Sequence, residues 1–271
     1  MRLLRPAVCG LLLAACAPKA PVAPRVVTIT AMDYAFAAPD TIPAGLTTFK
    51  MTNHGQEPHQ AVIMGASDHS FQELEAGAAT AKGIPEWLKF PAGPAVVIGG
   101  DSSNATAEIA PGNYVIVCYI PSTDGEPHLA KGMIRRLTVV PAPSGAAAAT
   151  PPTSDVTVTL ADFSFTLSTP LTAGTHAIRV ENKGPQMHEL VVEQLAPGKT
   201  LADWQAWAGG GMKGMGPAKP IGGFIGPNPG AVGWTTLTLA PGKYVLACYV
   251  PDANDGKPHI LHGMVQEITV S

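Results

Sequence analysis

The sequence repeats itself, and this duplication limits the possible folds more than any other feature. The offset is 129 residues between His59 and His188 and 131 residues between His128 and His259, so the two copies drift apart by only two positions. The matched pairs are Met32-Asp33-Tyr34-Ala35-Phe36 with Ala161-Asp162-Phe163-Ser164-Phe165, Asn53–His59 with Asn182–His188, Ala110–Pro121 with Ala240–Pro251, and Gly125–Met133 with Gly256–Met264. Because the copies share their order and spacing, the chain is predicted to contain two tandem domains of one fold.

The composition and the local patterns favour β structure. Gly and Pro supply 29 and 27 of the 271 residues, while charged residues make up only 14%. Such a chain has many reversals and few long surface helices. Segments such as 26–30 and 156–160 alternate apolar and polar residues, as half-buried strands do. About seven short strands per copy predict an all-β protein made of two tandem Greek-key sandwiches. A strand is also expected over 95–99, with short helical insertions over 70–80, 85–88 and 201–207.

Two segments rich in Pro and Ala mark the predicted domain boundaries. Residues 16–25 and 141–152 have too few large apolar side chains to build a core, so they are expected to form a tether and a semi-extended linker. Domain 1 is therefore predicted over 26–140 and domain 2 over 153–271.

Residues 1–15 have the features of an export signal. Arg2 and Arg5 precede an apolar stretch over 7–15 that is too short to span a bilayer. The segment ends in Leu13-Ala14-Ala15-Cys16, which resembles the bacterial lipobox. This resemblance implies cleavage before Cys16, lipidation of its thiol, and an exported protein anchored to a cell membrane and facing the periplasm or the exterior. An ordinary signal peptide followed by a chance cysteine is the alternative.

The charge pattern disfavours nucleic acid as a partner. The formal net charge is −3, and no run of Lys or Arg occurs. Binding to a phosphate backbone depends on clustered positive charge. The expected partners are the membrane, through the lipid anchor, and a redox or copper-exchange partner protein.

The cysteines are distributed one to a domain. Of the four, Cys9 lies in the predicted signal and Cys16 at the predicted lipidation site, which leaves Cys118 and Cys248. Neither domain then holds a second cysteine for an internal disulfide. A free thiol in an oxidising compartment is readily oxidised unless something occupies it, and a metal ion is one such occupant.

Each copy carries four residues that could hold a metal, in the same order. They are His59, Cys118, His128 and Met133 in the first copy, and His188, Cys248, His259 and Met264 in the second. A thiolate, two imidazoles and a weakly bound thioether form the trigonal donor set of a blue-copper site. The pattern predicts one copper per domain, with zinc as the alternative metal. A sandwich that keeps these residues only for packing is the alternative to metal binding.

These motifs resemble the cupredoxins, the family of plastocyanin and azurin, over nearly all of both domains. The Asn-x-Gly-x-x-x-His segments resemble the part of the family that carries the first ligand. The Pro-Gly-x-Tyr strand that ends in Cys, followed by His and Met, resembles the part that carries the other three. The resemblance implies cupredoxin-like sandwiches, type 1 copper and single-electron transfer. The step from Cys to His is longer than in small plastocyanin-like carriers, at ten residues in the first copy and eleven in the second.

The residues beside the two cysteines predict that the chain is not an enzyme. Multicopper oxidases and copper nitrite reductases place a His next to the copper Cys, whereas here Tyr119 and Tyr249 occupy the following positions. No ligand set for a second, open metal site is evident. Single-electron transfer is the expected function, and the alternatives are a copper storage or delivery lipoprotein and a metal-free binding or scaffold module. His262 aligns with Lys131 and is a second-choice ligand. Asp255-Gly256 is predicted to form a turn, with calcium binding as a distant alternative.

Overall fold

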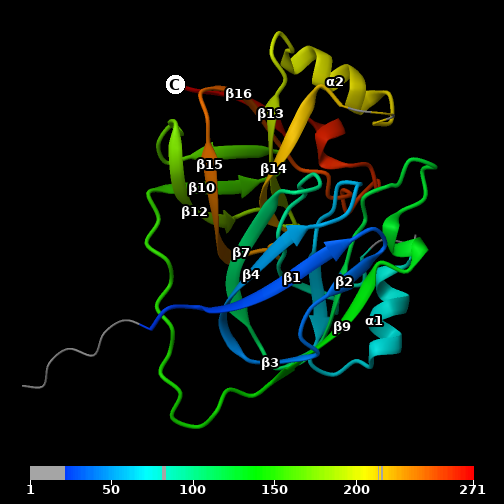
Figure 1. Cartoon of the computed structure of the whole chain (residues 1–271), viewed down its shortest axis with the longest axis vertical. Helices are drawn as coiled ribbons and strands as arrows, with labels where there is room; N and C mark the ends of the chain where they lie inside the picture. Colours follow the sequence, from blue (N-terminus) through cyan, green and yellow to red (C-terminus); the bar gives the residue numbers. More distant parts are fainter. Residues whose placement is uncertain (1–21, 81–83, 213, 215) are drawn as a thin grey trace, which may run out of the picture.

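Strands dominate the structure, which is a computed structural model. It describes residues 22–80, 84–212, 214 and 216–271. These contain seventeen strands, two α-helices and two 3-10 helices, so the predicted all-β class is confirmed. Figure 1 shows the first half of the chain below and the second half above, with the connecting segment running along one side. The predicted signal, and Cys16 with it, lies outside the described residues.

The first half consists of two sheets that pack against each other. In one, β1 pairs in parallel with β4, and β4 pairs antiparallel with β7. In the other, β8 lies between β5 and β9. The strands are β1 (Arg25–Met32), β2 (Ala35–Ala37), β3 (Thr41–Pro43), β4 (Gly45–Asn53), β5 (Val62–Ala66), β6 (Lys89–Ala92), β7 (Ser102–Ile109), β8 (Gly112–Val117) and β9 (Ile134–Val140).

The second half repeats this arrangement. Strand β10 pairs in parallel with β12, β12 pairs antiparallel with β15, and β16 lies between β13 and β17. The duplication seen in the sequence is therefore also a duplication of strand order. The strands are β10 (Val156–Ala161), β11 (Ser164–Leu167), β12 (Gly174–Asn182), β13 (Glu189–Leu195), β14 (Ala218–Ile225), β15 (Val232–Leu239), β16 (Gly242–Ala247) and β17 (Val265–Val270).

The two halves share one sheet instead of only facing each other. Strands β7 and β15 meet at Thr106 and Trp234 and join both halves into an eight-stranded sheet. Asn104 strengthens this junction, because its side-chain amide donates to the carbonyl of Thr236 and accepts from the amide of the same residue, both at 2.9 Å. The largest core cluster also contains side chains from both halves.

Replacing Asn104 with Leu is expected to lower the free energy of unfolding by about 1–2 kcal/mol, because two hydrogen bonds across the junction are lost. Urea denaturation of the metal-free protein measures the change. Glu108→Leu on the same strand is the control, since Glu108 is exposed and makes no side-chain hydrogen bond within the described residues. Equal stability of the two variants would contradict the role given to Asn104.

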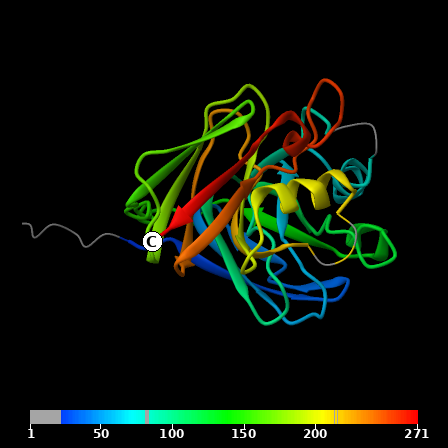
Figure 2. The ribbon, with the colours of Figure 1, turned by 90° about the horizontal axis from the view of Figure 1, so that it is seen from above.

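Both helices lie on the side of the molecule away from the described ends of the chain (Figure 2). Helix α1 (Phe71–Ala78) begins at Ser70, whose side chain accepts from the amide of Glu73 while the Glu73 carboxylate accepts from Ser70. Helix α2 (Leu201–Gly209) begins with the same reciprocal pairing of Thr200 and Asp203. This capping box satisfies amides that the first helical turn leaves unpaired, so the insertions form helices despite their short length.

Two local predictions are wrong. Residues 85–88 form a single turn, closed by a bond from the amide of Leu88 to the carbonyl of Pro85, and not a helix. Residues 95–99 form no regular strand, because their backbone groups pair with two different segments. Val97 exchanges backbone hydrogen bonds with His59, while the amide of Ala95 donates to Gly223 in the other half. This segment connects the first histidine with the junction between the halves.

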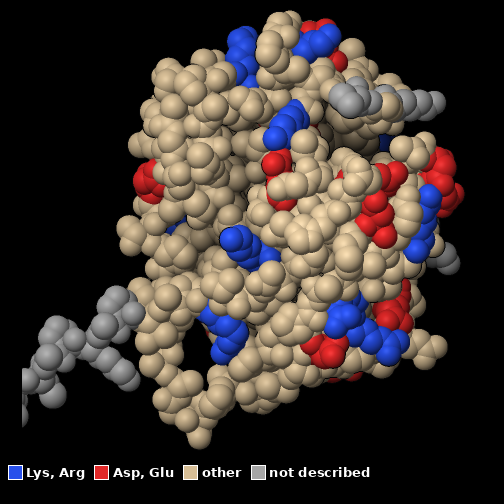
Figure 3. Space-filling view, in the orientation of Figure 1, with Lys and Arg blue, Asp and Glu red and all other residues tan. Residues whose placement is uncertain are grey.

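Few charged side chains cover the surface. On the face in Figure 3, Lys and Arg lie singly or in small groups near Asp and Glu, with large uncharged areas between them. Among the described residues, no helix combines the length and apolar character needed to cross a membrane.

Candidate metal centre

The first half brings His59, Cys118 and His128 together in its interior. The Sγ atom of Cys118 lies 3.9 Å from Nδ1 of His59 and 3.5 Å from Nδ1 of His128, and the two nitrogens are 3.0 Å apart. All three residues are fully buried. Metal–ligand bonds of about 2.0–2.3 Å, as for Zn²⁺ held by His and Cys, can bridge pairs separated by up to about 4.3 Å. One ion can therefore contact all three atoms.

The second half repeats this geometry with His188, Cys248 and His259. The thiol sulfur lies 4.0 Å and 3.3 Å from the two Nδ1 atoms, which are 3.1 Å apart. The backbone amide of Glu189 donates to the sulfur of Cys248 at 3.3 Å. The two clusters hence agree within a few tenths of an ångström, although their loops from Cys to His differ in length by one residue.

The two predicted methionine ligands are buried beside the cysteines. Met133 comes directly before β9, and its backbone accepts from Cys118 at 3.3 Å and donates to His128 at 2.9 Å. Met264 makes the equivalent bonds with Cys248 and His259, at 3.3 and 3.0 Å. Both methionines and both cysteines belong to one core cluster. These backbone hydrogen bonds thus place each methionine next to its cysteine.

Alternation along β8 explains why the thiol faces inward. Tyr114, Ile116 and Cys118 belong to the central core, whereas Val115 and Val117 face the cluster that includes α1. Successive side chains of a strand point to opposite faces, so the position of Cys118 follows from the register of β8. The sequence predicted a strand that ends in the cysteine, and the structure adds the face to which its side chain points.

Carboxylates orient both histidines of the first half. Asp33 accepts from Nε2 of His59 at 3.0 Å, and Glu57 accepts from Nε2 of His128 at 2.6 Å. With Nε2 protonated, each Nδ1 presents a lone pair, and two lone pairs then face each other across 3.0 Å. A cation between them removes this repulsion, so the donor set fits a metal ion held by Nδ1 of each ring.

The second half departs from this pattern at one histidine. Asp162 accepts from Nε2 of His188 at 2.6 Å, as Asp33 does for His59. In contrast, Nε2 of His259 is buried without a hydrogen-bond partner, and its nearest carboxylate oxygen, on Asp252, is 3.9 Å away. The two centres therefore differ in the surroundings of the histidine that follows the cysteine.

These carboxylates were not predicted from the sequence, although one signal for them was present. Asp33 and Asp162 occupy equivalent positions in the repeated segments that contain Tyr34 and Phe163. An acidic residue kept in both copies of a duplication indicates a shared role. Glu57 had no such signal, because its counterpart is Gln186, which instead bonds to Asp162 and Asp252.

A buried asparagine shapes the loop before the first histidine. Asn53 accepts from the amide of Gly55 at 2.8 Å and donates to the carbonyls of Glu57 and Val97 at 2.8 and 3.0 Å. Asn182 makes the corresponding bonds in the second half. These bonds bring Gly55 so close to the histidine that an added Cβ would lie 2.7 Å from Nε2 of His59 and would also contact the Asp33 carboxylate. The motif Asn-x-Gly-x-x-x-His is thus explained by packing.

Gly55→Ala is expected to destabilise the protein by about 1–3 kcal/mol, because the new methyl group displaces the His59 ring or its carboxylate. Thermal unfolding of the metal-free protein and the copper content after reconstitution measure the effect. Gly209→Ala is the matched control, since a Cβ at Gly209 meets no atom within 4 Å. Unchanged stability and copper content in Gly55→Ala would contradict the packing argument.

Burial sets the protonation of the ligands in the absence of metal. It raises the pKa of Cys118 to about 11 and raises the pKa of Cys248 well above its ordinary value. Burial also lowers the pKa of His59 and His188, although their carboxylate partners oppose this, and it lowers the pKa of His259 to about 4. Near neutral pH each centre therefore holds a protonated thiol, and a metal ion must displace that proton.

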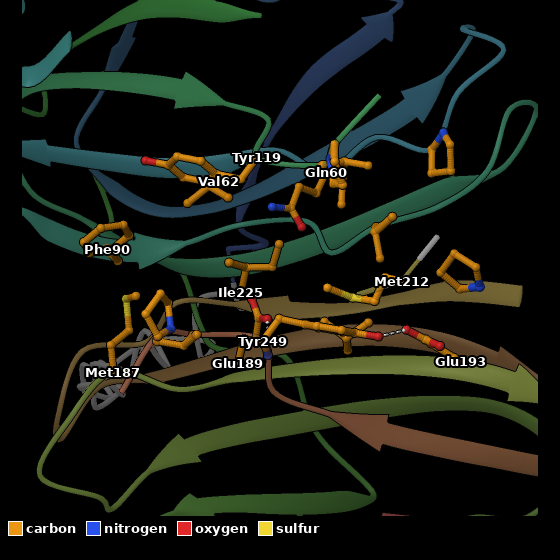
Figure 4. A pocket seen from close by; sticks show the side chains of 18 of the residues that line it. Gln60, Val62, Phe90, Tyr119, Met187, Glu189, Glu193, Met212, Ile225 and Tyr249 are labelled. Atoms are coloured by element: carbon orange, nitrogen blue, oxygen red, sulfur yellow. Dashed lines mark hydrogen bonds between the residues drawn. The ribbon is translucent and has the colours of Figure 1, made fainter. Parts of the chain in front are cut away.

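The residue after each cysteine faces a cleft between the halves. The cleft has a volume of 2710 Å³, and Tyr119 and Tyr249 lie on opposite walls (Figure 4). The wall of the second half carries two buried acidic residues. Glu193 accepts from the Tyr249 hydroxyl at 2.6 Å, while Glu189 accepts from the Tyr249 amide at 2.8 Å, and burial raises the pKa of Glu189 to about 7.

No family model matches the sequence, and no curated protein is similar to it at the level of sequence. Auracyanin from Roseiflexus castenholzii is 26% identical, with a TM-score of 0.32, over 44% of this chain and 99% of its own. Blue copper oxidase from Nitrosomonas europaea is 16% identical, with a TM-score of 0.27, over 91% of this chain and 85% of its own. The copper-containing nitrite reductase from Thermus scotoductus is 12% identical, with a TM-score of 0.26, over 92% and 62%.

The prediction that the chain is not an enzyme is corrected by these comparisons. The solved structures that span 91% and 92% of this chain are named an oxidase and a nitrite reductase. The tyrosines beside the cysteines therefore do not decide between a carrier and an enzyme. The cupredoxin resemblance itself is confirmed at the level of fold and donor set. Two β-rich halves each contain a His-Cys-His group with a buried methionine beside the thiol, which fits a type 1 copper site.

Proposed function

We propose that this chain is an exported copper protein that transfers single electrons through two type 1 sites, one in each half. The observation that carries the proposal is the repeated cluster in which two Nδ1 atoms, 3.0 or 3.1 Å apart, face one buried thiol. His59, Cys118, His128 and Met133 would hold the first copper, and His188, Cys248, His259 and Met264 the second. Copper supplies a one-electron couple that both nitrogen and sulfur ligands can accommodate.

The surroundings of each cluster suit repeated electron transfer. Asp33 holds the ring of His59, and Asp162 holds that of His188, so neither histidine must move when the charge at the centre changes. Each thiol directly follows a central strand, β8 or β16, whose backbone is paired on both sides. Full burial of the ligands keeps water from the site. A site that keeps its geometry in both oxidation states has little to reorganise.

Voltammetry of the copper-loaded protein tests the proposal. Electron transfer requires a reversible Cu(II)/Cu(I) couple that accounts for two copper ions per chain. A protein that holds only Cu(I) and passes it to an acceptor chelator, without a reversible couple, would instead support copper storage or delivery. A protein that binds neither oxidation state would support the metal-free binding module.

We also propose that Cys16 carries lipid and anchors the chain to a cell membrane. The lipobox-like end of the signal and the Pro- and Ala-rich segment that follows support this location. In a bacterial host, Cys16→Ala is expected to remove the lipid and release the protein from the membrane fraction, while the wild type remains in it. Mass spectrometry of the mature N-terminus is the direct measurement. A wild-type protein cleaved elsewhere and lacking lipid would contradict the anchor.

A further inference from the structure

A second group of metal-ligand side chains lies beside the centre of the second half. Asp252, Asp255 and His262 each offer one ligand atom, and these atoms lie within 4.8 Å of one another. Asp252 and Asp255 belong to the loop from Cys248 to His259, and His262 ends the 3-10 helix η2 (His259–His262). Asp252 is buried, whereas Asp255 and His262 reach solvent. An ion could therefore enter from outside.

The first half shows what occupies the equivalent place. There Lys131, which aligns with His262, ends the 3-10 helix η1 (His128–Lys131), and its Nζ lies 2.5 Å from Oδ2 of Asp124. Ser122, the counterpart of Asp252, donates to the other oxygen of Asp124 at 2.7 Å. In the first half, Lys131 of η1 thus supplies a cation to the loop carboxylate. In the second half the residue aligned with Lys131 is an imidazole, a carboxylate replaces the serine, and the exposed Lys257 of the loop pairs with Asp255 instead.

The buried face of this cluster contains an unpartnered group. Nε2 of His259 is buried, makes no hydrogen bond, and lies 3.9 Å from Oδ2 of Asp252. The equivalent atom of the first half, Nε2 of His128, is paired with Glu57 at 2.6 Å. A buried ring nitrogen without a hydrogen-bond partner is destabilising. The second half therefore has no hydrogen-bond partner for this nitrogen, whereas the first half has Glu57. The nearest carboxylate to the unpartnered nitrogen belongs to Asp252, a member of the acidic cluster.

We propose that Asp252, Asp255 and His262 bind a divalent transition-metal ion of the zinc class, as a third metal site of the chain. One imidazole and two carboxylates are suitable ligands for such an ion, and three protein ligands leave a position for water. Water bound there supplies the acceptor that Nε2 of His259 lacks. The site is independent of the copper proposal, because none of its three ligands belongs to the buried clusters.

The present contacts of the three ligands are compatible with this role. Asp255 accepts from Nε2 of His262 at 3.1 Å and from the amide of Lys257, and its other oxygen lies 3.1 Å from Nζ of Lys257. The side chain of Lys257 is 64% exposed, so it can leave without cost to the core. Asp252 accepts from the amides of Asn254 and Asp255 and from the side chain of Gln186. The His262 ring stacks on Phe163, at 4.9 Å between centroids, which holds it in place.

Calorimetric titration with Zn²⁺ tests the site in the full chain. The protein is first loaded with copper, and zinc is then added to the wild type and to His262→Lys. The wild type is expected to bind one zinc ion more than the variant. His262→Lys is expected to fold, because the first half has Lys at this position facing the equivalent aspartate. Equal zinc stoichiometry in the two proteins would overturn the proposal.

The reciprocal variant is expected to create a zinc site in the first half, where His262→Lys removes one from the second. Ser122→Asp combined with Lys131→His gives the first half the side chains of the second, and one additional zinc ion is expected. The visible spectrum of the copper-loaded protein should be the same in wild type and His262→Lys. If the buried clusters do not take up copper, the proposed electron transfer is refuted. The difference of one zinc ion between wild type and His262→Lys still tests the third metal site separately.

Discussion

Replacing Cys248 with Ser is expected to remove one of two copper ions and about half of the visible absorbance of the reconstituted protein. The physical reason is that the intense band of a type 1 site arises from charge transfer between a thiolate and Cu(II), and serine supplies no sulfur. Each half holds one described cysteine, and both are free. Metal analysis and the visible spectrum of protein reconstituted with Cu(II) give the measurement.

The matching variants separate the two centres. Cys118→Ser should remove the other half of the absorbance, and the double variant should be colourless. Because serine is close in size to cysteine, the metal-free variants should unfold near the wild-type temperature, which serves as the control for folding. A wild-type protein without the band, or a double variant that keeps it, would refute the assignment of the thiols as copper ligands.

Copper affinity is expected to rise about tenfold for each unit of pH between roughly pH 5 and 9. In this range each thiol is protonated, because burial raises the pKa of Cys118 to about 11 and that of Cys248 well above its ordinary value, while burial lowers the pKa of His59, His188 and His259. A thiolate ligand requires loss of that proton, so each copper bound releases one. One unit of pH then changes the binding free energy by about 1.4 kcal/mol.

The direction in which copper affinity changes with pH follows from which form of the site holds the proton. The metal-free site binds the proton and the loaded site does not, so acid favours the metal-free site. Below pH 4 the dependence should steepen in the second half, because His259, with a pKa of about 4, becomes protonated as well. Competition with a chelator of known pH dependence measures the affinity. An affinity that does not change between pH 6 and 8 would contradict a buried neutral thiol in the metal-free protein.

Much of the fold could be predicted because the strand pattern is local. Apolar and polar residues alternate along β1 and β10, as half-buried strands do, whereas β8 is apolar over Tyr114–Val117, so its pattern does not tell which way the following thiol points. The segment 95–99 could not be predicted in this way. Its apolar residues suggested a strand, yet its backbone groups bond to His59 on one side and to Gly223 of the other half on the other. That partner lies far away along the chain.

The order of the ligands, the duplication and the donor set were determined by the sequence alone, because each is a property of residue type and spacing. The tertiary structure decided how those ligands are supported. Asp33 lies 26 residues from His59 along the chain and Glu57 lies 71 residues from His128, so only the packing of loops brings each carboxylate against its ring. The tertiary structure also decided that β7 and β15 join the halves, and that His259 lacks the partner that His128 has. These features depend on contacts between distant segments, which local spacing does not encode.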